Sequence, residues 1–417
     1  MKYWKKYTEE ELNQKVSEAL SRTLNYDNTN TIGIPGTKLD NAMFYDGFDF
    51  VKKSPYLRTF IQNPNHIGCH TYDKADILFG GTFDIERELI QLLSKDILNG
   101  EDEEFDGYIA QGGTEANIQA MWVYRNYFKN EKNAKHEEIA IITSADTHYS
   151  AYKGSDLLNI DIIKVPVEFY TRKIQEEVLD SIIKEAKENG KKYFIVISNM
   201  GTTMFGSVDD PDLYANTFDK YELDYKIHVD GAFGGFIYPI GNKNCNTDFS
   251  NKNVDSITLD AHKMLQAPYG TGIFLCRKNL IHNTLTKEAT YIENLDVTIS
   301  GSRSGANAVA VWMILATYGP FGWLEKIDKL RNRTNWFCNE LENLNITYYK
   351  EEMMNLVTIE SKYVNDEIVE KYFLTPEVHN DTNKWYKINV MEHVHLEILN
   401  SLINDLKNHL NSSTKTA

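Results

Sequence analysis

The sequence predicts an α/β protein with a mostly parallel sheet in a large domain, a smaller C-terminal α/β domain and an N-terminal arm. From about residue 105 to residue 280, short β-rich apolar runs alternate with amphipathic helical stretches, which is typical of a parallel sheet covered on both faces. The expected strands are Tyr108–Ala110, Ile139–Thr143, Ile160–Val165, Tyr193–Ser198, Ile227–Asp230, Ser256–Ala261 and Gly272–Arg277. Several end in polar residues, and ligands of open α/β sheets bind beyond the carboxyl ends of the strands.

The chain has 417 residues, which exceeds the size of about 250 to 300 residues at which single cores stop growing. We therefore expect an arm over residues 1–80 that wraps a dimer, a large domain over 81–318 and a small domain over 319–417. In the arm, Thr8 to Leu24 has helical periodicity, whereas Asn25 to Phe79 reads as a loop.

The last hundred residues predict the small domain element by element. A buried helix at 304–318 closes the large domain. The small domain then contains a helix at Trp323–Leu344, a strand at Leu356–Glu360, a helix at Asn365–Phe373, a strand at Trp385–Val390, a final amphipathic helix and a frayed tail at Ser412–Ala417.

Composition excludes several classes of function. Sixty acidic residues against 44 basic ones, a net charge of −16, argue against binding to nucleic acid. No apolar run is long enough to span a membrane and the N-terminus lacks an apolar signal core, so we expect a cytoplasmic protein.

The four cysteines are far apart, and Pro64 and Gly68 interrupt the helical spacing of His66 and His70, so no metal site is expected. These histidines are expected in a loop near the substrate entrance.

Two residues at predicted strand ends carry the most information. Asp230 closes the strand before Gly231, and Lys263 follows the next strand on a tight turn, 33 residues later (263 minus 230). An amine that forms an imine with an aldehyde, and a carboxylate that holds a pyridinium nitrogen protonated, are what pyridoxal phosphate requires of a protein. Either residue alone has an ordinary reading, as a solvated lysine or as an aspartate that opens a turn.

Three other polar turns lie at the same predicted sheet edge. Gly113 and Thr114 begin a predicted helix, where free N–H groups can bind phosphate, and His262 adds a donor. His148 could stack on the face of an aromatic cofactor opposite Ala232. Local sequence leaves alternatives open: plain helix capping for Gly113 and Thr114, and a backbone-bonded loop position for His148. Thr202 is a candidate cofactor or substrate contact, with a structural turn as its alternative.

Together these motifs resemble the group II pyridoxal-phosphate-dependent amino-acid decarboxylases of the aspartate-aminotransferase fold (fold type I, with a seven-stranded sheet). The residues of these motifs are similar to those of short bacterial histidine decarboxylases and plant serine decarboxylases. The shared elements, in family order, are GGTEAN at 112–117, DTHYS at 146–150, GTT at 201–203, HVDGA at 228–232, HKM at 262–264 and TISGSR at 298–303.

The resemblance implies a role for each matching position. Lys263 would hold the cofactor as an imine, and Asp230 would bind the nitrogen of the cofactor ring. His148 would stack on one face of that ring, and Ala232 would lie against the other face. Gly113, Thr114 and His262 would bind its phosphate, and the turn containing Ser302 would reach the phosphate in a partner subunit, which implies a homodimer. Tyr291, seven residues before Thr298 (298 minus 291), matches a loop tyrosine, and we expect it to protonate Cα; its alternative is a surface tyrosine.

The expected activity is decarboxylation of an L-amino acid to an amine and CO₂, with a polar or aromatic side chain such as histidine or tyrosine. Candidate side-chain contacts come from the arm: Tyr45, His66, His70 and Tyr72. A retro-aldol lyase similar to the sphingosine-phosphate lyases is the first alternative, an aminotransferase is a weaker one, and a non-catalytic cofactor-binding subunit is remote.

Overall fold

The structure is a computed structural model that describes residues 4–23, 47, 49–73, 77–101, 104–287, 295–379 and 382–413. Its center is a seven-stranded sheet in the order β2-β8-β7-β6-β5-β3-β4. The strands are β2 (Phe105–Ala110), β3 (Ile139–Ser144), β4 (Asp161–Val165), β5 (Tyr193–Asn199), β6 (Asp224–Asp230), β7 (Val254–Asp260) and β8 (Gly272–Arg277). Only β8 runs antiparallel to its neighbours, so the prediction of a mostly parallel seven-stranded sheet is confirmed.

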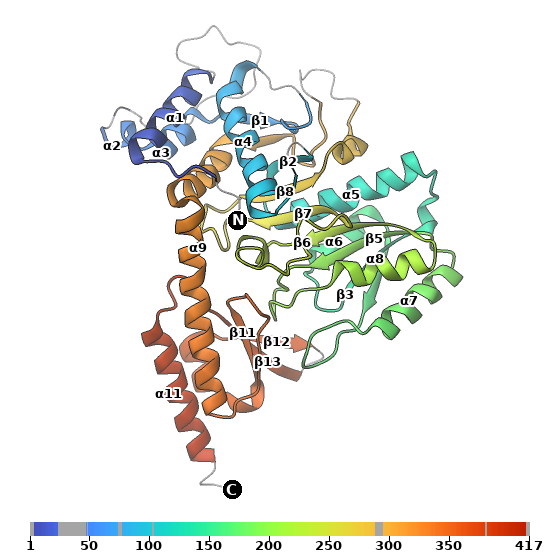
Figure 1. Cartoon of the computed structure of the whole chain (residues 1–417), viewed down its shortest axis with the longest axis vertical. Coiled ribbons are helices and arrows are strands. Elements are labelled where there is room, and N and C mark those ends of the chain that lie inside the picture. The colour runs from blue at the N-terminus through green and yellow to red at the C-terminus, as the bar shows by residue number, and fades with distance from the viewer. Residues whose placement is uncertain are drawn as a thin grey trace.

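Helices cover both faces of this sheet (Figure 1). They do so because alternate residues of a strand such as β5 point to opposite faces and both sets are mostly apolar. On β5, Ile195 packs in the core that contains α5 (Gly113–Glu131), whereas Phe194 packs in the core that contains α7 (Glu176–Glu188) and α8 (Pro211–Lys220). A strand buried on both faces needs a continuous apolar run, because neither set of side chains meets water. This is the pattern that made the strands predictable.

The N-terminal segment is more ordered than its composition suggested. The predicted first helix is α1 (Glu9–Ser21), which Thr8 and Glu11 cap reciprocally. The expectation of a loop from Asn25 to Phe79 is wrong in part, because the segment contains α2 (Asp49–Lys52), α3 (Pro55–Gln62), β1 (Asn65–Ile67) and a 3₁₀ turn at Ile77–Phe79. Proline at the first position of α3 suits a helix start, and α3 packs against α1 and α9.

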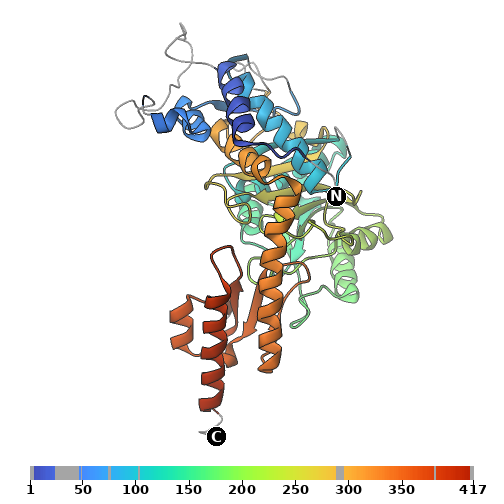
Figure 2. The ribbon, with the colours of Figure 1, turned by 60° about the vertical axis from the view of Figure 1, so that its left-hand side comes forward.

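Helix α9 (Gly305–Asn343) links the large sheet to the C-terminal elements and forms the long spine of Figures 1 and 2. The sequence predicted two helices here, and the structure joins them across a kink where Gly319 has a φ of 61° before Pro320. The C-terminal sheet is antiparallel, in the order β10 (Tyr348–Tyr349), β11 (Leu356–Glu360), β13 (Thr382–Asn389) and β12 (Thr375–His379).

Helices α10 (Asp366–Tyr372) and α11 (Leu396–Ser413) complete this part of the chain. The expected strand near Trp385–Val390 begins earlier, at Thr382, and β12 was missed. Residues 412 and 413, expected in a frayed tail, belong to α11. The division of the chain at residues 80 and 318 stays a prediction.

The sheet brings several strand ends to one edge. Asn199 at the end of β5 pairs with Asp230 at the end of β6, and Asp230 pairs with Thr258, two residues before the end of β7. Helix α5 begins directly after the turn that follows β2, and α4 (Gly80–Leu92) precedes that strand. Among the described residues, no helix has the length and apolarity needed to cross a membrane.

Candidate active site

A cavity of about 420 Å³ opens at this edge of the sheet, which is a size that suits a small ligand. Its walls come from the turn after β2 and the start of α5, from the segment after β3, and from the ends of β6 and β7. The lining residues are Gln111, Gly112, Gly113, Thr114, Glu115, Asn117, His148, Tyr149, Ala232, Asp260, His262 and Lys263. Six of the predicted cofactor residues therefore line one cavity: Gly113, Thr114, His148, Ala232, His262 and Lys263.

Asp230 lies beside this cavity and is 7% exposed. Its Oδ2 accepts a hydrogen bond from Asn117 Nδ2 at 2.7 Å, and its Oδ1 accepts one from the backbone N–H of Ala232 at 3.1 Å. Both oxygens are therefore held in place by groups that also line the cavity.

Lys263 lies on a turn directly after β7, where its backbone N–H donates to the carbonyl of Asp260 at 3.1 Å. Its side chain is 35% exposed, and its Nζ lies 3.2 Å from Asp260 Oδ2. Burial raises the pKa of the Asp260 carboxyl group, and the charges of Lys263 and His262 oppose that rise. Among the described residues, Asp260 Oδ1 and His262 Nδ1 are buried without a hydrogen-bond partner, so the chain itself leaves both polar atoms unsatisfied.

The start of α5 leaves room for a ligand group. No side chain caps this helix, so the first-turn N–H groups, including that of Thr114, are available. A Cβ atom added at Gly113 would lie 2.7 Å from Asp260 Oδ2 and 3.2 Å from the Cβ of Ala232. Only glycine keeps this space open.

The His148 ring is partly buried, and its Nδ1 lies 2.9 Å from Ser150 Oγ. Burial lowers the pKa of His148; the charge of Asp230 raises it, and that of Lys263 lowers it further. The neutral, flat ring therefore shares the cavity with Ala232, as the stacking hypothesis requires.

Other predicted residues do not line the cavity. Thr202 is buried, and its hydroxyl lies 2.7 Å from Ser207 Oγ. Ser302 is exposed on β9 (Ser302–Ser304), where its Oγ accepts a hydrogen bond from Asn65 Nδ2 at 3.2 Å. Tyr72 packs at the edge of the core around α5. Tyr45 and Tyr291 lie outside the described residues, so their roles stay predictions.

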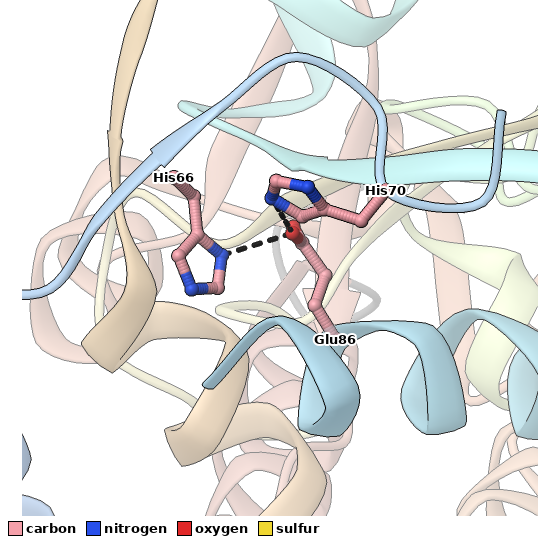
Figure 3. A group of neighbouring side chains, drawn as sticks. All are labelled: His66, His70 and Glu86. Atoms are coloured by element: carbon pink, nitrogen blue, oxygen red, sulfur yellow. Dashed lines mark hydrogen bonds and ion pairs between the residues drawn. The ribbon is translucent and has the colours of Figure 1, made fainter. Parts of the chain in front are cut away.

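His66 and His70 lie in a buried cluster around Glu86 of α4, not at the cavity wall (Figure 3). Glu86 Oε2 lies 2.9 Å from His66 Nδ1 and 3.1 Å from His70 Nε2. Its Oε1 accepts hydrogen bonds from Arg303 Nη1 at 2.8 Å and from the backbone N–H of Ile109 at 2.9 Å. The arrangement gives these histidines a structural explanation, and their contact with a substrate remains a prediction.

The three donor atoms of this cluster lie within 4.8 Å of one another, a spacing that a metal ion could use. The charge of Arg303 already compensates Glu86 and would repel a cation, and His66 Nε2 is bonded to Thr82 Oγ1 at 2.9 Å. Burial lowers the pKa values of both histidines, whereas Glu86, although buried, has a lowered pKa because Arg303 and His66 stabilise its charge. An ion-pair network with Arg303 therefore accounts for these residues.

Two residues near the site escaped the sequence interpretation. Asn117 belongs to the GGTEAN motif, which assigned it no role, although its Nδ2 donates a hydrogen bond to Asp230 Oδ2. Lys387, on β13, donates from its Nζ to the carbonyl of Thr203 at 3.1 Å. Burial lowers the pKa of Lys387, and the charge of Lys263 lowers it further. No motif marks Lys387, because it comes to this edge through the C-terminal sheet.

Comparison with known proteins decides the family. Residues 82–361 match the family model described as the pyridoxal-dependent decarboxylase conserved domain. The chain belongs to the pyridoxal-dependent decarboxylase family. It is 81% identical over 407 residues to a tryptophan decarboxylase of Clostridium sporogenes (strain ATCC 15579), an alignment that covers 98% of each chain. Both findings agree with the resemblance stated from the motifs.

Solved structures show the same fold. L-methionine decarboxylase from Streptomyces sp. 590 is similar with a TM-score of 0.71, at 17% identity and over 95% of this chain and 93% of that one. A sphingosine-1-phosphate lyase of Burkholderia pseudomallei K96243 is similar with a TM-score of 0.69, at 18% identity and over 80% and 78% of the two chains. These likenesses establish the fold type I architecture and do not distinguish one reaction from another.

The chain is thus a pyridoxal-phosphate-dependent amino-acid decarboxylase, a carboxy-lyase. The cavity of this decarboxylase fits the cofactor on structural grounds. The unpartnered ring nitrogen Nδ1 of His262, the free N–H groups of α5 and the space at Gly113 provide hydrogen-bonding groups and room for a phosphorylated ring.

Replacing Gly113 by alanine tests this fit. The new Cβ would crowd Asp260 and Ala232, and overpacking of this kind costs about 1 to 3 kcal/mol. We therefore expect the dissociation constant of pyridoxal phosphate to rise about tenfold or more, measured by titrating the apoenzyme. Gly80→Ala is the matched control, because a Cβ there meets nothing within 4 Å. Equal cofactor affinity in the two variants would contradict the proposed phosphate site.

Proposed function

We propose that this decarboxylase converts L-tryptophan into tryptamine and CO₂. The observation that carries the proposal is the identity of 81%, over 98% of the chain, to a protein named tryptophan decarboxylase. An indole side chain also agrees with the sequence-based expectation of an aromatic or polar substrate. Lower identities, such as 32% to a probable L-aspartate decarboxylase of Pyrococcus abyssi (strain GE5 / Orsay), carry less weight for substrate identity.

In this proposal, residues of the cavity hold the cofactor and control protons around it. Lys263 provides the amine that attaches the cofactor, and Asp230 keeps a proton on its ring nitrogen. The Asp230 carboxylate suits that role because two hydrogen bonds fix its oxygens. His148 and Ala232 enclose the ring. Bound pyridoxal phosphate supplies an electron sink for the pair left at Cα when CO₂ departs.

The phosphate is proposed to lie at the start of α5. Gly113 and Thr114 offer backbone N–H groups there, and His262 offers a ring nitrogen, Nδ1, without a partner among the described residues. Thr202 and Ser302 are proposed as further cofactor contacts that complete the site from outside the cavity of a single chain, which neither of them lines.

Two further residues are proposed to act on the substrate itself. Lys387 is half-buried, makes no ion pair among the described residues and lies near Lys263, so its ammonium group offers a partner for the substrate carboxylate. Tyr291 is proposed to deliver the proton to Cα, with the sequence resemblance as its only support.

A panel of L-amino acids tests the substrate assignment. We expect CO₂ release and amine formation with the highest kcat/KM for L-tryptophan, compared with L-tyrosine, L-phenylalanine and L-histidine. Lys263→Ala should lower kcat by about 10³-fold or more, because it removes a covalent participant. Lys243→Ala, at an exposed turn, is the control and should retain activity.

The products also separate the alternative reactions. An aldehyde and phosphoethanolamine would indicate the retro-aldol lyase, and a keto acid would indicate an aminotransferase. Preference for another amino acid, with CO₂ still released, would overturn only the assignment of tryptophan.

The enzyme is further proposed to be a cytoplasmic homodimer with sites at the subunit interface. Two tyrosines adjoining the cavity support a covering partner: Tyr149 is 58% exposed and Tyr269 is 87% exposed. Aromatic side chains are enriched at protein interfaces. The N-terminal arm, residues 1–80, is proposed to wrap this dimer.

Sedimentation analysis of the holoenzyme tests the dimer. We expect a mass of about twice 48.1 kDa at the concentrations used for activity assays. Tyr269→Asp should shift the population toward monomer and lower activity together, because a charge would be buried at the interface. A fully active monomer would contradict the proposal.

A further inference from the structure

A series of hydrogen bonds connects the sheet core to the cavity. Asp230 determines which group donates and which group accepts in each of these hydrogen bonds. Both carboxyl oxygens of Asp230 accept hydrogen bonds, one from Asn117 and one from the backbone of Ala232. Asn117 Nδ2 lies 2.7 Å from Asp230 Oδ2 and 2.9 Å from Ser150 Oγ. Turning the amide over would place two acceptor oxygens 2.7 Å apart, so the amide nitrogen must face Asp230.

The amide oxygen of Asn117 consequently faces His228, which is fully buried in β6. Asn117 Oδ1 lies 2.9 Å from His228 Nε2, and an amide oxygen only accepts, so Nε2 carries the hydrogen. Burial lowers the pKa of His228 to about 4, which leaves the ring neutral near pH 7 and its Nδ1 without a proton. Ser256 Oγ, 2.7 Å away, donates to that nitrogen and accepts from the hydroxyl of Tyr124.

Toward the cavity, the same logic fixes the tautomer of His148. Ser150 Oγ accepts from Asn117, so its own hydrogen is free to point at His148 Nδ1, 2.9 Å away. The backbone N–H of Ser150 is directed at the same nitrogen at 3.3 Å. His148 Nδ1 is therefore an acceptor, and the neutral ring carries its hydrogen on Nε2. Among the described residues, Nε2 has no hydrogen-bond partner, and the ring lines the cavity.

We infer that His228 is a positioning residue that holds the Asn117 amide in the one orientation that serves both Asp230 and His148. His148 then presents an N–H donor, and not a lone pair, to an anionic group of a ligand in the cavity. This inference rests on the proposed cofactor site. It extends that proposal to a residue that does not line the cavity: His228 acts through Asn117, and Thr258 Oγ1 lies 3.1 Å from the same Nε2.

Two conservative variants of His228 separate this role from simple packing. A glutamine amide nitrogen can replace imidazole Nε2 and donate to Asn117, whereas the shorter asparagine reaches only toward Ser256. We expect His228→Gln to bind pyridoxal phosphate with nearly wild-type affinity. His228→Asn and His228→Leu should each weaken binding by about tenfold, because the buried amide oxygen of Asn117 loses its donor and the amide is then held only from the side of Asp230 and Ser150.

A second readout follows the tautomer directly. Nitrogen NMR of holoenzyme labelled with ¹⁵N-histidine should show His148 protonated on Nε2 in the wild type and in His228→Gln, with a mixture of tautomers in His228→Asn. Thr143→Val is the matched control, because it removes a buried hydroxyl from β3 whose one hydrogen bond within the described part of the chain is to the carbonyl of Ile197. It should change neither readout.

Two results would overturn the inference: equal cofactor affinity and equal His148 tautomers in the glutamine and asparagine variants, or an unchanged His228→Leu protein. If the leucine variant does not fold, the comparison of glutamine with asparagine decides. Neither readout depends on which amino acid is decarboxylated, so a failed tryptophan assay in the wild type would overturn the proposed substrate and leave this test intact.

Discussion

The site depends on one constraint: a buried carboxylate at the end of β6 has to be held in one orientation. Asp230 is 7% exposed, and burying a charge without partners is costly. Asn117 from α5 and the backbone of Ala232 provide those partners. Two opposite charges about 4 Å apart attract by about 4 kcal/mol at an effective dielectric constant near 20, so a carboxylate fixed in this way can keep a proton on a pyridine nitrogen.

A second buried charge organises the side of the molecule nearest the N-terminal segment. Glu86 joins four segments through side-chain or backbone contacts: β1 through His66, the following turn through His70, β2 through Ile109 and β9 through Arg303. Strand β2 leads into the turn before α5, and β9 carries Ser302, so both proposed phosphate-binding segments are anchored to one carboxylate. Removing either partner of such a buried pair is far more costly than the pair is stabilising.

Much of the large sheet could be predicted because its strands are buried on both faces and so appear as continuous apolar runs. The polar residues that follow those runs, among them Asp230 and Lys263, could be placed at one edge for the same reason. The contacts of His66 and His70 could not be predicted, because they depend on residues far away in the chain. Glu86 lies 20 residues from His66, and Arg303 lies 217 residues from Glu86. Helix α3 was not predicted because its stability comes from packing on α1 and α9. Lys387 was not predicted because β13 lies next to Thr203 only in the folded chain.

The central claim is that Lys263 carries the cofactor, and chemical trapping tests it most directly. Reduction of the holoenzyme with sodium borohydride makes the link between cofactor and lysine permanent, and peptide mapping by mass spectrometry then locates it. We expect the cofactor-derived mass on the peptide that contains Lys263 and on no other. A stoichiometric label on Lys387 or on any other lysine, with Lys263 unmodified, would contradict it.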